Sequence, residues 1–261
     1  MIEMENKTIS LTFGDAGENH AGMEMLGNLG EEGSGFTCEE LIKIGKNYEN
    51  SEYHNFLLDE IGLNAGILII RNFINHKKHL KLFDEFNNIE WDKKYYDLRR
   101  KKVLNKLARS NIVILDGIEQ KPDYENKKGK IVNGENLKYF SRLKRKMVRN
   151  FNEILNNNKC SNLICEGNQY FDLKKCGIGY HGDAERRKVI ALRLGQPMKM
   201  NWQWFHRFKP VGNTFEFEIN GGDLYIMSEK AVGNDWKKSS QYTMRHAAGC
   251  DKYINLRKYG K

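Results

Sequence analysis

The carboxyl-terminal third of the chain alternates apolar and polar residues with a period of two. The clearest runs lie at residues 189–195, 202–208, 215–219 and 222–228. Turn-forming sequences such as Pro210-Val-Gly-Asn and Asn220-Gly-Gly separate them. Because period-two runs joined by such turns are typical of antiparallel strands, the pattern predicts an antiparallel barrel or sandwich in this part of the chain.

Helical signals lie mainly in the first 150 residues. Thr37, with Glu40 three residues later, has the capping-box spacing that begins a helix, here expected to end near Tyr48. The same reasoning predicts helices at 51–61 and 76–88, a buried strand at 66–70, a strand at 112–115 and exposed positions for His76 and His79.

The first forty residues differ in composition from the rest, with seven glycines and nine acidic residues against one basic residue. We expect a strand, a loop and then a helix that begins near Ala21. The polar residues at this junction are Asp15, Glu18 and His20. They are an alternative metal-binding group, but polar turn residues are the preferred interpretation. Residues 1–60 are therefore interpreted as an acidic, Gly-rich extension of unknown role that precedes a domain at 61–261.

Basic residues concentrate in the remainder of the chain, which carries a net charge of +17, whereas the whole chain has +9 and a pI near 9.1. Two clusters stand out, Arg99-Arg-Lys-Lys102 and Arg142-Leu-Lys-Arg-Lys-Met-Val-Arg149. The second belongs to an apolar stripe at helical spacing, formed by Phe140, Leu143, Met147 and Phe151. Each cluster alone is compatible with the solvated face of an amphipathic helix, whereas the two together favour a phosphate-bearing partner such as DNA or RNA.

Other features of composition point to an intracellular protein. The five cysteines are scattered, which favours reduced thiols over a disulfide framework. No eighteen consecutive residues are apolar, and the first residues lack the basic and then apolar pattern of a signal peptide. We therefore expect no membrane association, while the oligomeric state is not indicated.

The candidate chemistry begins at His181 and Asp183. These residues are two apart, so on an extended strand both side chains leave the same face. His246, in Tyr-Thr-Met-Arg-His-Ala-Ala-Gly, is the best third ligand. Two imidazoles and one carboxylate on one face are typical of non-haem Fe(II) oxygenases.

An ordered set of further motifs accompanies this group. It comprises Gly66-Ile-Leu-Ile-Ile-Arg-Asn-Phe-Ile, Trp91, Asn168-x-Tyr170, His181-x-Asp183-x-Glu185, the Leu-Arg-Leu-Gly strand that ends at Gly195, Gly222-Asp-Leu-Tyr-Ile-Met-Ser, Asp235-Trp236, His246 and Asn255-Leu-Arg257-Lys. In this order the motifs resemble the AlkB-like branch of the Fe(II)- and 2-oxoglutarate-dependent oxygenases. The resemblance covers residues 66–261.

The resemblance implies an α+β fold with a double-stranded β-helix (jelly-roll, cupin-like) core and flanking amino-terminal helices. It implies a dioxygenase that uses Fe(II), 2-oxoglutarate and O2 to hydroxylate or oxidatively demethylate a nucleic-acid base, with residues 102–150 as a substrate lid. Two alternatives remain. One is the same chemistry on a protein or small-molecule substrate. The other is a non-catalytic nucleic-acid-binding module on a degenerate barrel.

Roles are then expected for individual residues. His181, Asp183 and His246 hold the metal and are the catalytic group. Arg257, eleven residues after His246, is expected to bind the far carboxylate of the cosubstrate, because arginine binds carboxylates bidentately. Asn168 and Tyr170, on one strand face, are expected to hydrogen-bond the same molecule, as their counterparts in the family do.

Substrate-binding residues are expected around this centre. The aromatic residues available for stacking an unpaired base, and the polar residues near them, are Tyr180, Trp202, Trp204, Phe205, Glu185 and Arg109. Among the departures from the family, His246 follows Trp236 by ten positions rather than a few. We interpret the difference as an inserted loop, with His206 as the alternative third ligand.

Overall fold

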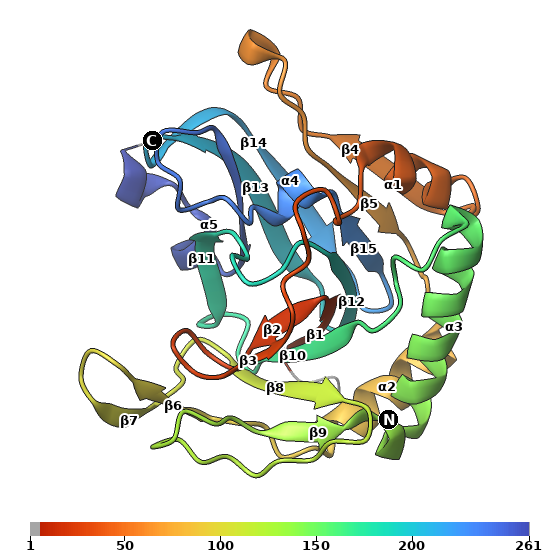
Figure 1. Ribbon diagram of the computed structural model, residues 1–261, viewed down its shortest axis with the longest axis vertical. Coiled ribbons are helices and arrows are strands. Elements are labelled where there is room, and N and C mark those ends of the chain that lie inside the picture. Colours follow the sequence, from red (N-terminus) through yellow and green to blue (C-terminus); the bar gives the residue numbers. More distant parts are fainter. Residues whose placement is uncertain (1–5, 261) are drawn as a thin grey trace.

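The computed structural model describes residues 6–260 and shows a mixed α+β protein dominated by antiparallel sheets (Figure 1). Residues 1–5, on which the expectation of no signal peptide rests, lie outside the described part. Two sheets form the framework, a larger one of eight strands and a smaller one of four. Apolar residues from both sheets pack in a common core, as expected for two sheets packed face to face.

The larger sheet brings together strands from the whole length of the chain. In spatial order it contains β4 (Ser51–Asn55), β5 (Gly66–Ile70), β15 (Leu224–Met227), β12 (Val189–Gly195), β1 (Thr8–Gly14), β10 (Ile164–Tyr170), β8 (Ser110–Leu115) and β9 (Ile131–Asn133). Neighbouring strands are antiparallel, except that β8 and β9 are parallel.

The smaller sheet is built entirely from the carboxyl-terminal part of the chain. Its order is β11 (Gly177–His181), β16 (Thr243–Gly249), β13 (Met198–His206) and β14 (Lys209–Ile219). Two hairpins lie apart from the sheets, β2 (Ala16–Glu18) with β3 (Met25–Gly27), and β6 (Lys94–Asp97) with β7 (Lys102–Asn105).

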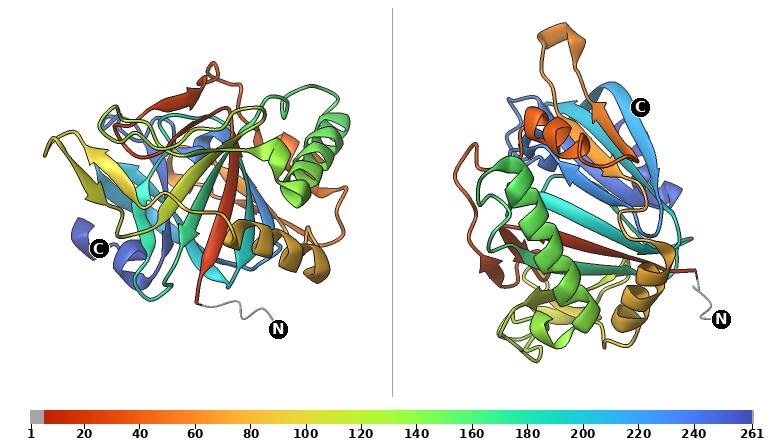
Figure 2. Two further views of the ribbon diagram at one scale, coloured as in Figure 1. Left: turned by 90° about the horizontal axis from the view of Figure 1, so that it is seen from below. Right: turned by 90° about the vertical axis from the view of Figure 1, so that its right-hand side faces the viewer.

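Three helices pack near the outer face of the larger sheet. They are α1 (Cys38–Gly45), α2 (His76–Asn87) and α3 (Lys138–Leu155), and Figure 2 shows α3 lying along α2. The remaining helices are short: α4 (Glu229–Val232), α5 (Asp251–Ile254), η1 (Asp59–Ile61), η2 (Gly134–Asn136) and η3 (Arg257–Tyr259). A second apolar core fills the space between the larger sheet and α1, α2 and α3.

Strand β1 illustrates how alternation serves both faces of the larger sheet. Ile9, Leu11 and Phe13 are fully buried in the core beneath the helices. Ser10 and Thr12 leave the opposite face and line a cavity between the sheets. Because successive side chains of a strand point to opposite faces, one short segment contributes to the core and to the candidate site.

The boundary placed at residue 60 does not correspond to a structural boundary. Strand β1 pairs with β12 on one side and β10 on the other, and β4 extends the same sheet. The helix expected at 51–61 is instead β4 followed by η1, and the helix expected near Ala21 is replaced by the β2–β3 hairpin. Residues 1–60 are therefore part of the framework, as far as they are described.

Two further expectations are wrong. His79 is buried rather than exposed, and its Nε2 accepts a hydrogen bond from the amide of Gly195 at 2.9 Å. The segment 102–150 is not a lid as a whole, because β8 lies inside the larger sheet and α3 covers its outer core. The neighbouring hairpin β6–β7 approaches the mouth of the cavity, where Tyr95 stacks on His20, and from the segment 102–150 Arg109 lines the cavity.

Several local signals are confirmed. Thr37 and Glu40 form the capping box of α1, in which each side chain bonds the other residue's backbone amide. Helix α2 lies where it was expected, and the apolar stripe predicted for α3 packs into the core through Phe140, Met147 and Phe151. Within residues 6–260, no helix combines the length and the apolar character needed to cross a bilayer.

The central position of β1 makes a stability prediction. Replacing the fully buried Leu11 with alanine removes core contacts on a central strand, and we expect the free energy of unfolding to fall by ~3 kcal/mol. The matched control is Leu107→Ala, because Leu107 is 82% exposed and should change stability by no more than ~0.5 kcal/mol. Urea unfolding followed by circular dichroism measures both. Equal effects in the two variants would contradict a central position for β1.

Candidate metal centre and adjoining cavity

The two histidines of the candidate centre face each other across paired strands. His181 is the last residue of β11, His246 lies in β16, and the two are direct partners in the antiparallel register. A bulge between Ile178 and His181 shifts this register. Such irregularities redirect side chains, and here both imidazoles turn toward the space between the sheets. Asp183 follows two residues after His181, just beyond the end of the strand.

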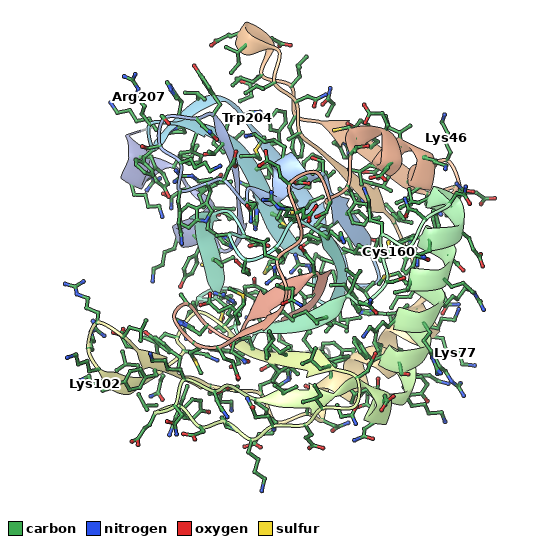
Figure 3. All side chains as sticks on the ribbon, in the orientation of Figure 1. Lys46, Lys77, Lys102, Cys160, Trp204 and Arg207 are labelled. Carbon is green, nitrogen blue, oxygen red and sulfur yellow. The ribbon has the colours of Figure 1, made fainter. Side chains whose placement is uncertain are left out.

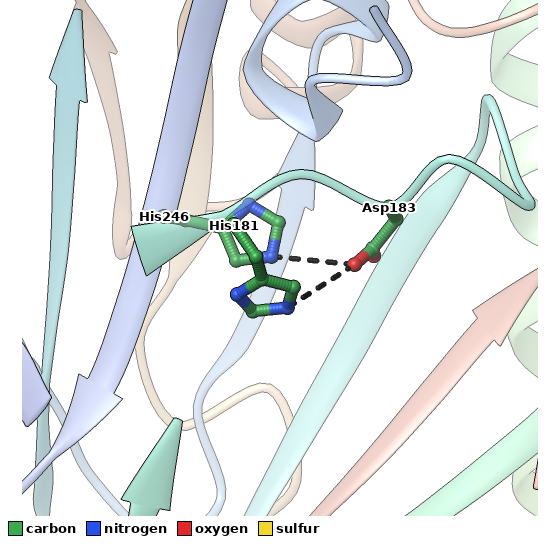
Figure 4. A group of neighbouring side chains, drawn as sticks. All are labelled: His181, Asp183 and His246. Atoms are coloured by element: carbon green, nitrogen blue, oxygen red, sulfur yellow. Dashed lines mark ion pairs between the residues drawn. The ribbon is translucent and has the colours of Figure 1, made fainter. Parts of the chain in front are cut away.

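The three side chains converge on one point (Figure 4). Oδ1 of Asp183 lies 3.5 Å from Nε2 of His181 and 3.5 Å from Nε2 of His246. The two imidazole centroids are 4.5 Å apart. One potential ligand atom from each residue lies within 4.8 Å of the others, so the group can hold a metal ion. The fold thus brings one carboxylate and two imidazoles together, as the sequence predicted.

The surroundings favour the ligand forms of these groups. Nδ1 of His181 lies 2.8 Å from the carbonyl of Gly179; a donated proton there leaves the Nε2 lone pair free. Burial alone would raise the pKa of Asp183, but His246, Arg186 and the two imidazole contacts hold it well below its usual value. Burial and the neighbouring His181 lower the pKa of His246, which favours the neutral imidazole.

A close backbone contact fixes the position of Asp183. A side chain at Gly182 would place its Cβ 2.0 Å from the carbonyl oxygen of Gly233, so only glycine fits between His181 and Asp183. The amide of Asp183 donates to the carbonyl of Val232 at 3.0 Å. Nδ2 of Asn234 donates to the carbonyl of Ala184 at 2.7 Å and holds the same loop from the α4 side.

Arg186 orients the carboxylates behind the centre. Its guanidinium donates to Glu166 and Glu185, and its Nε lies 3.7 Å from Oδ2 of Asp183. Because Arg186 faces Oδ2, Oδ1 remains directed at the two imidazoles. Burial raises the pKa of Glu185.

A cavity of about 500 Å³ adjoins the three residues and lies between the two sheets. From the larger sheet it is lined by Ser10, Thr12, Glu166, Asn168, Tyr170, Val189, Arg193, Tyr225 and Met227. From the smaller sheet it is lined by Ile178, His181, Met200, His246 and Ala248. Its volume lies in the range typical of small-molecule sites.

Arg193 is the most unusual residue in this cavity. It is 1% exposed, and its Nε and Nη1 have no hydrogen-bond partner within the described chain. Among the described residues its guanidinium makes one weak contact, from Nη2 to the sulfur of Met200 at 3.9 Å. A buried guanidinium without an acidic partner costs several kcal/mol, and the cavity offers the space in which an anion can compensate it.

The structure brings four of the other predicted residues to the cavity. Asn168, Tyr170, Glu185 and Arg109 line it. Asn168 Oδ1 accepts from Nε of Arg109 at 2.7 Å, and its Nδ2 donates to Glu166 at 3.0 Å. Of the junction residues interpreted as turn residues, Glu18 and His20 also line the cavity.

Other predicted residues lie elsewhere. Arg257 is exposed in η3 and does not line the cavity, because the chain after β16 forms short helices instead of another strand. Trp202 and Trp204 are fully buried in the core around Phe56, so they are not available for stacking a substrate. Tyr180 and Phe205 belong to a separate small cluster with Tyr259. His206 stacks on Tyr242 and takes no part in the candidate centre.

Three residues that line the cavity were not predicted from the sequence. Of these, Arg193 could have been recognised from its sequence context. A single charged residue in an otherwise apolar buried run, Val189-Ile-Ala-Leu-Arg-Leu-Gly, has to have a buried partner or a ligand. Ser10 gave no signal, because the partners of β1 lie more than 150 residues away. Trp236 lines the mouth of the cavity and was noted only as part of a motif.

The three converging residues make a direct prediction. We expect Asp183→Ala or His246→Ala to lower the affinity for a divalent transition metal by at least about 100-fold, because each removes one of three ligands. An anaerobic titration with Fe(II), or with Co(II) followed by visible absorbance, measures this. His206→Ala is the matched control and should keep the affinity of the unchanged protein. Loss of binding in the control alone would make His206 the ligand.

Comparison with known proteins found sequence similarity to a viral protein. No family model matches the chain. An uncharacterized protein of Acanthamoeba polyphaga mimivirus is 40% identical to it over 259 residues, which cover 95% of this chain and 98% of that protein. At this identity and coverage, the chain belongs to the same family as the uncharacterized mimivirus protein.

Proposed function

We propose that this protein is an Fe(II)- and 2-oxoglutarate-dependent dioxygenase that hydroxylates or oxidatively demethylates a nucleic-acid base. One observation carries the proposal: a group of two histidines and one aspartate opens into the same cavity as a buried arginine that lacks a partner. The metal group alone is compatible with many metalloproteins. The arginine adds a requirement for an anionic ligand beside the metal.

The residues present fit Fe(II). His181, Asp183 and His246 would hold the ion, and all three line the cavity, which would admit further ligands. When bound, Fe(II) and 2-oxoglutarate supply the oxidative chemistry, in which one oxygen atom of O2 is placed on the substrate and succinate and CO2 are released. The protein then contributes position, charge and exclusion of water.

Arg193 fits the far carboxylate of 2-oxoglutarate better than Arg257. Its Nε and Nη1 have no hydrogen-bond partner among the described residues, and either can pair with Nη2 to donate two parallel hydrogen bonds to a carboxylate. Ser10, Tyr170 and Tyr225 line the same part of the cavity and offer hydroxyl donors. Met200 closes this end with an apolar wall, which strengthens the charge interaction by keeping water away. Asn168 and Tyr170 keep the role expected for them.

We further propose that the two sheets form a jelly-roll. The chain passes from one sheet to the other between β10 and β11, β11 and β12, β12 and β13, β14 and β15, and β15 and β16. This alternation is the connectivity that a double-stranded β-helix requires. Strand β1 fills the place between β10 and β12 that a strand after β16 would otherwise take. Because β1 holds this place, no strand after His246 enters the sheet there. We therefore assign the carboxylate-binding arginine to β12.

The mouth of the cavity supports a planar, anionic substrate. Trp236 and His20 line it, and His20 stacks on Tyr95 with a centroid distance of 3.7 Å. The tip of the β6–β7 hairpin approaches the β2–β3 loop there, since a Cβ on Gly22 would lie 2.5 Å from Leu98. This hairpin carries the first basic cluster, and Lys102 lies at its outer end (Figure 3). Aromatic side chains beside a basic strip suit an unpaired base and its phosphates.

The role of Arg193 is tested against Arg257. We expect Arg193→Met to weaken 2-oxoglutarate binding to the Fe(II)-loaded protein by at least about 100-fold under anaerobic conditions, because it removes a charge-assisted bidentate contact. Arg257→Met should leave that affinity within about twofold, since Arg257 is exposed and outside the cavity. Isothermal titration calorimetry measures both. The reverse pattern would return the carboxylate-binding role to Arg257.

The substrate class is tested by turnover. With Fe(II), 2-oxoglutarate and O2, we expect methylated single-stranded oligonucleotides to stimulate succinate release and to lose methyl groups, detected by mass spectrometry. Replacing Arg99, Arg100 and Lys102 with glutamate reverses the charge of this cluster. The change should weaken oligonucleotide binding by about tenfold or more and reduce the salt dependence of binding. Succinate release without any nucleic acid, from protein or small-molecule substrates only, would reject the nucleic-acid assignment and retain the oxygenase.

A further inference from the structure

We infer that a second cavity, between α2 and α3, binds a small amphiphilic anion, an aliphatic carboxylate with a chain of medium length. This cavity has a volume of about 350 Å³ and shares no lining residue with the candidate metal centre and its cavity. We name it the helix cavity. The residues that line it are Tyr48, Phe73, Ile74, Lys78, Lys81, Leu82, Tyr139, Arg142, Leu143, Lys146, Met147 and Asn150.

The floor of the helix cavity is apolar and rigid. Ile74, Leu82 and Met147 are buried parts of the core beneath the helices. Tyr48 and Phe73 are half-buried and pack on each other at a centroid distance of 5.8 Å, and both contact Phe151 behind them. Binding an aliphatic chain to such a floor is favourable, because it removes apolar surface from water.

The rim of the helix cavity is uniformly cationic. Lys78 and Lys81 project from α2, and Arg142 and Lys146 project from α3. All four are exposed, and no Asp or Glu is among the lining residues. Within the described chain no ion pair involves Lys78, Arg142 or Lys146, whereas Lys144 on the same helix pairs with Asp116 at 2.7 Å. Four cations around an apolar floor complement an anionic head group on an apolar body.

The enclosed volume favours a small molecule over a macromolecule. About 350 Å³ lies in the range of cavities that bury a small ligand, whereas a partner helix requires a groove that extends over several turns. A carboxylate is the head group to which an arginine and two lysines from facing helices can donate together. The chain of the ligand then occupies the floor beside Leu82 and Met147.

Isothermal titration calorimetry with dodecanoate below its micellar concentration tests the inference on the full chain. We expect saturable binding with one site per protein, and an affinity that falls by roughly fourfold for each methylene removed from the chain. Dodecyltrimethylammonium, which has the same tail and a cationic head, should bind at least tenfold more weakly. Equal binding of the two amphiphiles would overturn the inference, because it would indicate adsorption through the tail alone.

Paired variants on α3 separate the helix cavity from general surface charge. The double variant Arg142→Glu/Lys146→Glu should weaken dodecanoate binding at least tenfold. The matched control, Arg145→Glu/Arg149→Glu, makes the same change of charge on exposed positions of the same helix that do not line the helix cavity, and should change binding by less than threefold. Circular dichroism confirms that both variants are folded. Equal losses in both pairs, or binding only to anionic phospholipid vesicles, would reject the inference.

Discussion

The pairing of β11 with β16 is the constraint on which the candidate centre depends. It places His181 directly opposite His246, although 64 residues separate them in the sequence, and direct cross-strand partners leave the same face of the sheet. The contact between Gly182 and Gly233 then returns the chain so that Asp183 faces both imidazoles. The hydrogen bonds between paired strands hold cross-strand neighbours within a few ångströms of each other. The three candidate ligands would therefore need little rearrangement to hold a metal ion.

Two opposing charges lie on either side of the cavity between the sheets. Asp183, Glu166 and Glu185 surround Arg186 on one side, and its single positive charge offsets only part of their negative charge. Arg193 on the other side has no such compensation within the described residues. The asymmetry gives the cavity an acidic end at the candidate metal ligands and a basic end at Arg193. A molecule that carries a carboxylate and can also reach the metal would satisfy both ends at once.

Local patterns in the sequence predicted the structure correctly where the structure depends on residues a few positions apart. The capping box at Thr37, the apolar stripe of α3 and the His-x-Asp spacing each depend on residues a few positions apart, and the structure agrees with them. Arg257 was assigned by counting one strand beyond His246, but the chain after β16 forms the short helices α5 and η3 instead of a strand. Trp202 alternates correctly toward the space between the sheets, yet Phe56 from a distant segment covers it. Long-range packing of this kind leaves no trace in a local pattern.

The position of β1 has a consequence for the synthesis of the protein. Thr8 pairs with Tyr170 on one side and with Gly195 on the other, so β1 is synthesised well before either of its partner strands. Until then its apolar face, Ile9, Leu11 and Phe13, is exposed to the cellular environment. Folds dominated by such distant pairings form slowly, because a large loop closes before any contact stabilises it. An exposed apolar segment of this kind favours aggregation of the nascent chain until β10 and β12 have been synthesised.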